Sequence, residues 1–451
     1  MDVVHEYLNE LASASKSSAP NQITQLTKLL NLNPHINSWI VRLNQANIVN
    51  NRDISTAVSK VVDDYNLYDN EWLAFNEVVV SFVRLCNQMN VWSSLESFDL
   101  YTTFLLDLSV AFNNNSRGHL LSFLVKDVIN VILPLLIKLD YQLYYKEFCT
   151  RPRLTYLASI LLKLFNNIRS QINDTPKKTI ILFVSNKLCL VYFKLSNPLL
   201  CRNIFSNMNN ANLKFTGFSR LEQVQYRFYL AKFYLIKDQL VDGYRHLEWC
   251  LENCSGRSNS IRILKYLLPV GMVIGKVAKY EVILGLLNNQ DVPFLPIYYE
   301  LDLSLRLGNY QRFNDTIVTH NQYLKDENLL LMLINKSKLI ILRNLVHKTW
   351  QITGRPSNLD YDAVKIALQT SLGPNIERLK PTFPIFQDII NIDDHVIENV
   401  FITLIDQNLL KGKIFPRLRK VALSKSNAFA KIDEINFMRF GNSKLDNWMN
   451  V

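Results

Sequence analysis

Glycine and proline are scarce in this chain, which has 12 glycines and 14 prolines in 451 residues. A fold made of many short strands needs turn-forming residues every few positions, so this scarcity favours long helices. Polar stretches such as "NNNSRG", "NCSGRSNS" and "TGRPSN" separate segments of roughly 20–40 residues, a length that suits single helices and helical pairs. The sequence therefore predicts a mainly α-helical protein.

Apolar residues in the middle of the chain repeat with helical spacing. Five of them, at positions i, i+3, i+4, i+7 and i+8, predict one apolar helix face: Tyr226, Tyr229, Leu230, Phe233 and Tyr234. A second amphipathic segment at 239–253 follows after a short connection, and 297–320 predicts a further pair that turns at Gly308-Asn309. No fixed motif recurs, so we expect a degenerate array of helical repeats, similar to tetratricopeptide repeats.

The pattern changes after "TGRPSN". We expect a helix at 359–372, and then a second helix that begins at Asp393-Asp394 and stops near Gly412. The second helix should bury one face, made by Ile397, Val400, Phe401, Leu404 and Ile405. Two short β-like runs, "KIF" and "KVALS", follow. Helix, helix and two-stranded ribbon is the order of a winged helix, with the ribbon as its wing.

The stretch "NLLKGKIFPRLRKVALSKS" at 408–426 contains six basic residues and no acidic one. The basic residues are Lys411, Lys413, Arg417, Arg419, Lys420 and Lys425. On a ribbon they can lie along phosphates while Ile414, Leu418, Val421 and Leu423 anchor the strands to the core. Two other interpretations stay open, a charged edge that prevents aggregation and a nuclear targeting signal.

Positive charge is concentrated in two blocks. Residues 151–280 contain 20 Lys/Arg and 6 Asp/Glu, a net charge of +14, and residues 330–425 contain 14 and 8, a net charge of +6. Residues 1–150 have a net charge of −5. Localised positive charge of this size favours an acidic partner, either nucleic acid or an acidic protein.

The sequence contains no convincing catalytic or metal-binding motif, and we expect no cofactor. "GMVIGK" is one residue too short for a phosphate loop, and Val277 replaces the Ser/Thr that such a loop needs. His246, Cys250 and Cys254 share a helical face but have no evident fourth ligand. The scattered cysteines suit a reducing compartment. The longest uncharged apolar runs are about ten residues, so we expect no membrane insertion. The N-terminus carries acidic residues early and has no long apolar core, so we expect no secretory signal.

Several long phrases resemble one branch of the PCI-domain proteins. They include "RILKYLLPVGMVIGK", "NPLLCRNIF", "LEQVQYRFYLAKFYLIKDQLVDGYRHLEWCLENC" and "VIENVFITLIDQNLLKGKIFPRLRKVALSKS". Within this branch, the sequence resembles the PCI subunit of the fungal transcription-coupled mRNA export complex at the nuclear pore. The resemblance implies helical repeats capped by a winged helix. It divides the chain into an N-terminal helical region (1–150), a helical-repeat part (151–355), a winged-helix part (356–430) and a tail (431–451).

The resemblance also implies a function and partners. We expect a non-catalytic nuclear scaffold subunit at the nuclear pore, paired through its winged helix with a larger PCI scaffold. Together they would bind RNA or DNA through the six basic wing residues. A small acidic, disordered subunit would also bind, for which the candidate contacts are Tyr226, Arg227, Lys232, Phe233 and Lys237. The alternative is a signalosome-associated PCI scaffold that acts through protein contacts alone.

Overall fold

The computed structural model describes residues 1–46, 54–171, 176–211, 213–287, 292–432, 435 and 445–450. The chain forms two compact units: unit 1 comprises residues 1–229 and 445–451, and unit 2 comprises residues 230–444. In sequence, unit 2 is therefore an insertion between the two segments of unit 1. The four-part division proposed from the sequence places its limits elsewhere and stays a prediction.

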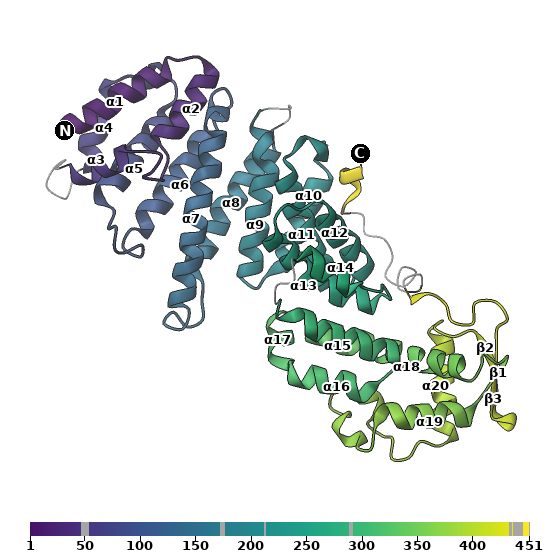
Figure 1. The fold of residues 1–451 in the computed structure, drawn as a ribbon. Helices are drawn as coiled ribbons and strands as arrows, with labels where there is room; N and C mark the ends of the chain where they lie inside the picture. The colour runs from purple at the N-terminus through teal and green to yellow at the C-terminus, as the bar shows by residue number, and fades with distance from the viewer. Residues whose placement is uncertain are drawn as a thin grey trace. The chain divides into compact units, whose positions relative to one another are not determined.

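Unit 1 is built from helices that mostly pack against their neighbours in sequence (Figure 1). Their bounds are α1 (Asp2–Ser15), α2 (Ala19–Leu29), α3 (Trp39–Gln45), α4 (Ile54–Asp64), α5 (Leu73–Gln88), α6 (Phe98–Phe112), α7 (Ser122–Leu143), α8 (Pro152–Arg169), α9 (Ile181–Lys194) and α10 (Cys201–Asn209). One helical stretch among the described residues, Gly118–Leu143, which consists of α7 and the short turn before it, is long and apolar enough to cross a membrane, with a mean hydropathy of 2.1. Just over half of that apolar stretch is buried inside the protein, as in the core helix of a folded unit.

Helix α11 (Arg220–Ile236) leads from unit 1 into unit 2. The helices that follow in unit 2 are α12 (Leu240–Asn253), α13 (Arg257–Val273), α14 (Tyr280–Leu286), α15 (Phe294–Leu307), α16 (Tyr310–Thr319), α17 (Asn321–Asp326), α18 (Leu330–Ile352), α19 (Tyr361–Leu372) and α20 (Asp394–Asp406). The expected mainly α-helical class is confirmed.

The two predicted helical pairs are present as α11–α12 and α15–α16. In α11 the predicted apolar face is buried except for Tyr229, which is half-buried. The turn between α15 and α16 lies at Gly308, whose φ of +71° favours glycine. A Cβ atom there would lie 2.5 Å from the backbone of Leu345 in α18, so the turn also needs glycine for close packing. Asn309 then caps α16 by accepting a hydrogen bond from the Arg312 main-chain N–H (2.8 Å).

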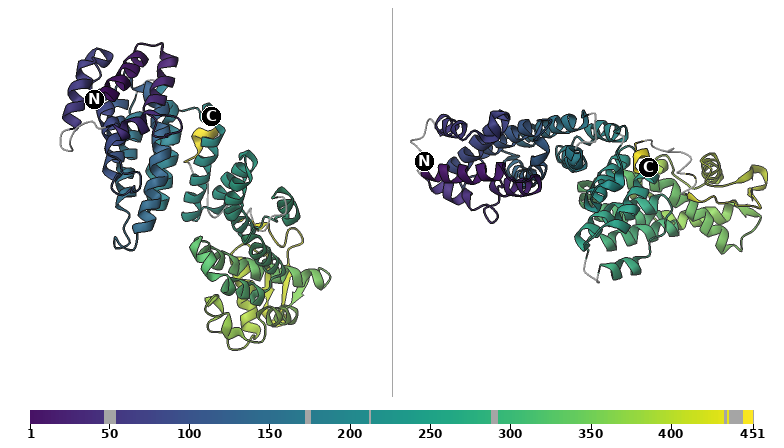
Figure 2. Two further views of the ribbon diagram at one scale, coloured as in Figure 1. Left: turned by 60° about the vertical axis from the view of Figure 1, so that its left-hand side comes forward. Right: turned by 90° about the horizontal axis from the view of Figure 1, so that it is seen from above.

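The C-terminal module, residues 358–423, combines α19 and α20 with a three-stranded antiparallel sheet (Figures 1 and 2). The strands are β1 (Asn358–Asp360), β2 (Gly412–Phe415) and β3 (Lys420–Leu423), in the order β1-β3-β2. Leu359 pairs with Val421 in β3, and Val421 also pairs with Ile414 in β2. The predicted order of two helices and a ribbon is therefore present, with an additional strand ahead of the first helix.

Two expectations about this module were wrong. Helix α19 begins at Tyr361 instead of Leu359, because Leu359 belongs to β1, where it is buried and pairs with Val421 of β3. Gly412 does not stop α20, which ends at Asp406 and is followed by Asn408 with a left-handed φ of +56°. Gly412 instead starts β2, where a Cβ atom would lie 2.7 Å from the carbonyl oxygen of Ala422.

Candidate functional site

The core of the C-terminal module holds its two helices in place. Asp393 caps α20 by accepting a hydrogen bond from the main-chain N–H of Val396 (2.9 Å), as the sequence predicted. The predicted apolar face of α20 is buried, apart from Ile405, which is half-buried. The Phe401 ring stacks on Tyr361 of α19 with 5.7 Å between centroids. The hairpin β2–β3 thus rests on a packed two-helix base.

All six basic residues of 408–426 are exposed. The strand register pairs Gly412 with Leu423 and Phe415 with Lys420, so Arg417 lies in the turn that closes the hairpin. Lys411 and Lys425 lie at the open end of the hairpin: Lys411 directly precedes Gly412, and Lys425 lies two residues after Leu423, the pairing partner of Gly412. Among the described residues, the structure records no ion pair for Lys411, Lys413, Arg417 or Lys425. These four cations can therefore contact an anionic partner.

Arg419 is held by two carboxylates. Its guanidinium donates to Asp394 (Nε–Oδ2 2.7 Å, Nη2–Oδ1 2.9 Å) and to Asp362 (Nη2–Oδ1 2.7 Å). The hydrogen bonds from Arg419 lower the pKa of Asp394 below its ordinary value. Lys420 also has an acidic neighbour, with Nζ 3.4 Å from Asp360 Oδ1. Two of the six cations therefore have acidic partners within the module.

The apolar side chains of the hairpin divide between core and surface. Val421 and Leu423 are buried and Ile414 is half-buried, as expected of anchors. Leu418 was expected to be an anchor but is 67% exposed, because it lies in the turn beyond the paired strands. Phe415, which precedes that turn, is 43% exposed. The tip of the hairpin thus presents apolar surface beside Arg417.

The residues predicted to bind an acidic partner differ in exposure. Lys237 is exposed, whereas Arg227 and Lys232 are half-buried. Each of the two half-buried cations lies over an aromatic ring: Arg227 Cζ is 5.2 Å from the centroid of Phe215, and Lys232 Nζ is 4.7 Å from that of Tyr266. The rings of Tyr226 and Phe233 are buried in the interior, with 0% and 1% exposure. We therefore revise their role to core packing, because a buried ring cannot receive a partner without movement of the chain.

The C-terminal segment of unit 1 contains a contact that sequence reasoning missed. Trp448, in the short helix η9 (Asn447–Asn450), packs edge-on against Phe215 and Tyr226, with centroids 5.0 and 5.4 Å apart. It is 4% exposed, as buried as a core residue. The "NWM" triplet in a polar tail was the only signal in the sequence.

The weaker motifs acquire structural roles. His246 packs against Tyr234 with 5.5 Å between ring centroids, and Cys250 is fully buried. Cys254 contacts the hydroxyl of Ser260 at 3.4 Å. In the part of the chain that the structure describes, no group of three His, Cys, Asp or Glu residues has a metal-binding arrangement. The first three residues of "GMVIGK" are the buried end of α13, where Gly271 lies near the Tyr244 ring. The expectation that the whole stretch lies within a helix was wrong, because Gly275 and Lys276 follow the helix and are exposed.

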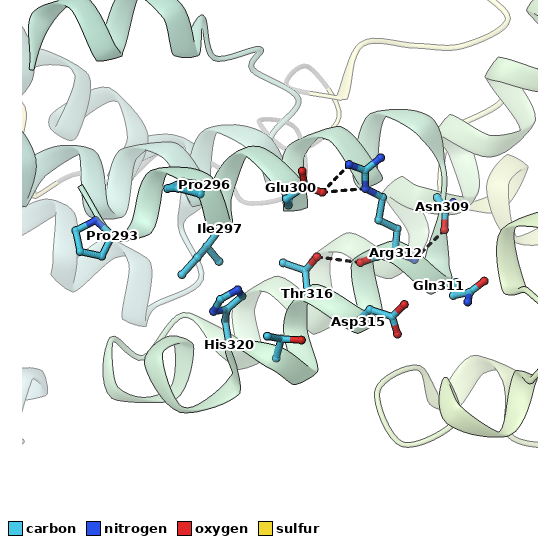
Figure 3. Close-up of a pocket in the computed structure, with 11 residues that line it drawn as sticks. Pro293, Pro296, Ile297, Glu300, Asn309, Gln311, Arg312, Asp315, Thr316 and His320 are labelled. Atoms are coloured by element: carbon cyan, nitrogen blue, oxygen red, sulfur yellow. Dashed lines mark hydrogen bonds and ion pairs between the residues drawn. The ribbon is translucent and has the colours of Figure 1, made fainter. Parts of the chain in front are cut away.

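A groove of about 560 Å³ lies between α15 and α16 (Figure 3). Two charged residues that line it, Arg312 and Glu300, form an ion pair with each other: Arg312 donates to Glu300 Oε2 from Nε (2.9 Å) and Nη2 (2.6 Å). The Thr316 hydroxyl donates to the main-chain carbonyl of Arg312 (3.0 Å). These contacts stabilise the helical pair.

Several known proteins are similar in sequence to this chain. No family profile matches it. The nuclear mRNA export protein THP1 of Saccharomyces cerevisiae is 27% identical over 455 residues, which cover 96% of each chain. A PCI domain-containing protein of Schizosaccharomyces pombe is 23% identical over 79% of each chain. PCI domain-containing protein 2 of Xenopus laevis is 25% identical over 62% of this chain and 64% of its own. The chain is therefore similar to PCI-domain proteins, and over nearly its whole length to yeast THP1.

Proposed function

We propose that this chain is a non-catalytic scaffold subunit of a nuclear mRNA export complex. The observation that carries the proposal is the similarity to THP1, a nuclear mRNA export protein, over 96% of both chains. A similarity of that extent covers the helical repeats and the C-terminal module together. The proposed location is the nucleus, at the periphery of the nuclear pore.

The C-terminal module acts as a winged helix in this proposal, and the hairpin β2–β3 is its wing. The strand–helix–helix–hairpin order and the sheet order β1-β3-β2 support this assignment. The module pairs with the equivalent module of a larger PCI scaffold. The exposed Leu418 and Phe415 at the tip of the wing are apolar surface that such a protein contact can bury.

The wing contributes cations to a surface shared by the two winged helices, which binds RNA or DNA. Lys411, Lys413, Arg417 and Lys425 support this role best, because they are exposed and have no recorded ion pair within the described residues. Basic side chains on a ribbon contact phosphates and release counterions, which makes binding sensitive to salt. Arg419 and Lys420 contribute less, because neighbouring carboxylates partly neutralise them.

The second proposed partner is a small, acidic, disordered subunit. The net charge of +14 over residues 151–280 supports it, since an acidic chain gains long-range attraction to such a block. On α11, the cations Arg227, Lys232 and Lys237 are the proposed contacts. The rings of Tyr226 and Phe233 do not take part, because they pack in the core.

Charge reversal of the wing tests the nucleic-acid role. We expect the variant with Lys411, Lys413, Arg417 and Lys425 changed to Glu to bind single-stranded RNA and DNA at least tenfold more weakly near 50 mM salt. The slope of log K against log[salt] should also become shallower, because fewer counterions are released. Fluorescence anisotropy of labelled oligonucleotides at several salt concentrations measures both quantities. A variant with wild-type affinity and slope would remove the wing from the binding surface.

The second candidate is a scaffold that acts through protein contacts alone, as in the signalosome-associated PCI proteins. The ion pairs of Arg419 and Lys420 favour it, because part of the basic wing then serves the stability of the module. Under this candidate, the wild-type chain and the wing variant would bind single strands equally weakly, while assembly with a PCI partner would be unchanged in both.

A further inference from the structure

The segment that follows the wing packs on the C-terminal end of α18. The ring of Phe429 lies 4.6 Å from His347 and 5.4 Å from Trp350, between centroids. His347 and Trp350 stack on each other at 5.7 Å. Arg343 donates from Nη2 to the carbonyl oxygen of Ala430 (3.1 Å), one residue beyond Phe429. The last turns of α18 and residues 428–430 therefore form one packed cluster.

Main-chain hydrogen bonds join this cluster to the open end of the wing. Lys411 donates its main-chain N–H to the carbonyl of Ala428 (2.7 Å), and its own carbonyl accepts from Ser424 (2.9 Å). Leu423 donates its main-chain N–H to Ser357 (2.9 Å), which lies two residues after Arg355. Lys411 and Lys425 thus belong to the same region of unit 2 as the end of α18, whereas Arg417 lies at the far end of the hairpin.

Two more exposed cations lie here: Lys348 in the last turns of α18 and Arg355, three residues after the helix ends. Arg355 Cζ lies 5.8 Å from the centroid of Trp350, whose Nε1 donates to the carbonyl of Pro356 (3.0 Å), so the aromatic ring is itself held in place. Within the described ranges, the structure records no ion pair for Lys348 or Arg355, and the recorded hydrogen-bond acceptors of Arg343 are an amide and a carbonyl. This part of the surface therefore carries positive charge without a recorded carboxylate partner.

The pKa of His347 agrees with a positive local field. Burial is the main cause that lowers it, and the charges of Arg343, Arg355 and Lys348 lower it further, to about 4. The imidazole is therefore neutral at pH 7. It is one of three rings that pack against one another, with Phe429 and Trp350, and the three cations around it supply the charge.

We propose that Lys348 and Arg355 extend the nucleic-acid surface of the wing, as a second phosphate-binding point for a single strand that also passes Lys411 and Lys425. The inference rests on the proposed function and adds residues that the sequence analysis did not single out. A single strand suits the site better than an acidic protein. A single strand offers one phosphate after another to several separate cations, and a guanidinium beside Trp350 resembles the combined basic and aromatic surfaces that follow nucleic-acid backbones.

The test uses the full-length chain with labelled oligo(U) and oligo(dT) as separate probes. The variant combines Lys348→Glu with Arg355→Glu, and a milder variant uses Gln at both positions. The control combines Lys16→Glu with Lys325→Glu, because both lysines are exposed, have no recorded ion pair and change the net charge equally. Lys325 lies just before the opposite end of α18, a helix of 23 residues that spans about 35 Å at 1.5 Å per residue.

We expect the Glu variant to bind both probes roughly tenfold more weakly than the control, with a salt slope lower by about 1–2. The Gln variant should lie between, and thermal melting should show that both variants stay folded. Equal loss with oligo(U) and oligo(dT) would identify the phosphate backbone as the ligand, whereas loss with oligo(U) alone would identify RNA.

Three results would overturn the inference. If reversal of the wing weakens binding but reversal of Lys348 and Arg355 does not, the second point is absent while the proposed function stands. If the wild-type chain binds neither probe, the proposed nucleic-acid role of the wing fails as well, and the scaffold that acts through protein contacts alone remains. If the Glu variant loses binding to polyglutamate but keeps its affinity for both oligonucleotides, the end of α18 receives an acidic protein.

Discussion

At the scale of single residues, Arg419 shows how a basic residue in a basic stretch can serve the fold. Its φ of +50° places it at the end of the hairpin turn, and its main-chain carbonyl accepts a hydrogen bond from Tyr361 N–H (3.0 Å). Its side chain joins the first turns of α19 and α20 through Asp362 and Asp394. Carboxylates at these helix starts are also favoured by the helix dipole. Arg419 thus connects all three parts of the C-terminal module.

We predict that Arg419→Gln lowers the melting temperature of the chain at pH 7 and that this difference shrinks as the pH falls. Asp394 has a lowered pKa in the folded state, so its interaction stabilises the fold above its unfolded pKa of about 3.9 and is lost as the pH falls through the folded value. Thermal melts of both proteins between pH 7 and pH 3 measure the effect. Lys413→Gln is the control, because it removes the same charge from an exposed residue without a recorded ion pair. An equal shift in the two variants would contradict the role of Arg419.

At the scale of elements, the strongest local signals predicted the module well. Asp393 before an apolar-periodic run placed the start of α20, and the β-branched and apolar residues around Pro416 placed the hairpin. Strand β1 could not be predicted, because three residues carry little periodicity and Leu359 becomes a strand residue only by pairing with Val421, 62 positions later. The contacts of Arg419 and of Trp448 are likewise set by tertiary structure. Trp448 meets Phe215 from more than 200 residues away.

The cap of α20 gives a prediction at this scale. Asp393→Ala should lower the free energy of unfolding of the module by about 1 kcal/mol, because the Val396 N–H loses its acceptor at the start of the helix. Asp393→Asn should retain most of the stability, since an amide oxygen also caps. Asp406→Ala, at the other end of the same helix, is the matched control. Chemical denaturation followed by circular dichroism measures all three, and equal losses at both ends would exclude the capping role.

At the scale of the whole molecule, charge is the property that most distinguishes the parts of this chain. The block at 151–280 has a net charge of +14 and residues 281–329 a net charge of −4, although the whole chain has only +11. The helical fold explains how such charge is tolerated, because long side chains on helices carry it to solvent while their apolar stems pack. Repulsion within the block disfavours the isolated chain, so we expect the proposed acidic partner to stabilise it by neutralising that charge.

The last prediction tests that argument on α11. Changing Arg227, Lys232 and Lys237 to Gln should weaken binding of an acidic polypeptide, measured with labelled polyglutamate at 50 and 200 mM salt, by severalfold at the lower concentration. The effect should shrink at the higher salt, because screening shortens the reach of the field. The control changes Lys16, Lys60 and Arg84 to Gln, which removes the same charge from exposed residues of the acidic region 1–150. Equal weakening in both variants would mean that polyglutamate responds to total charge and that α11 is not the binding surface.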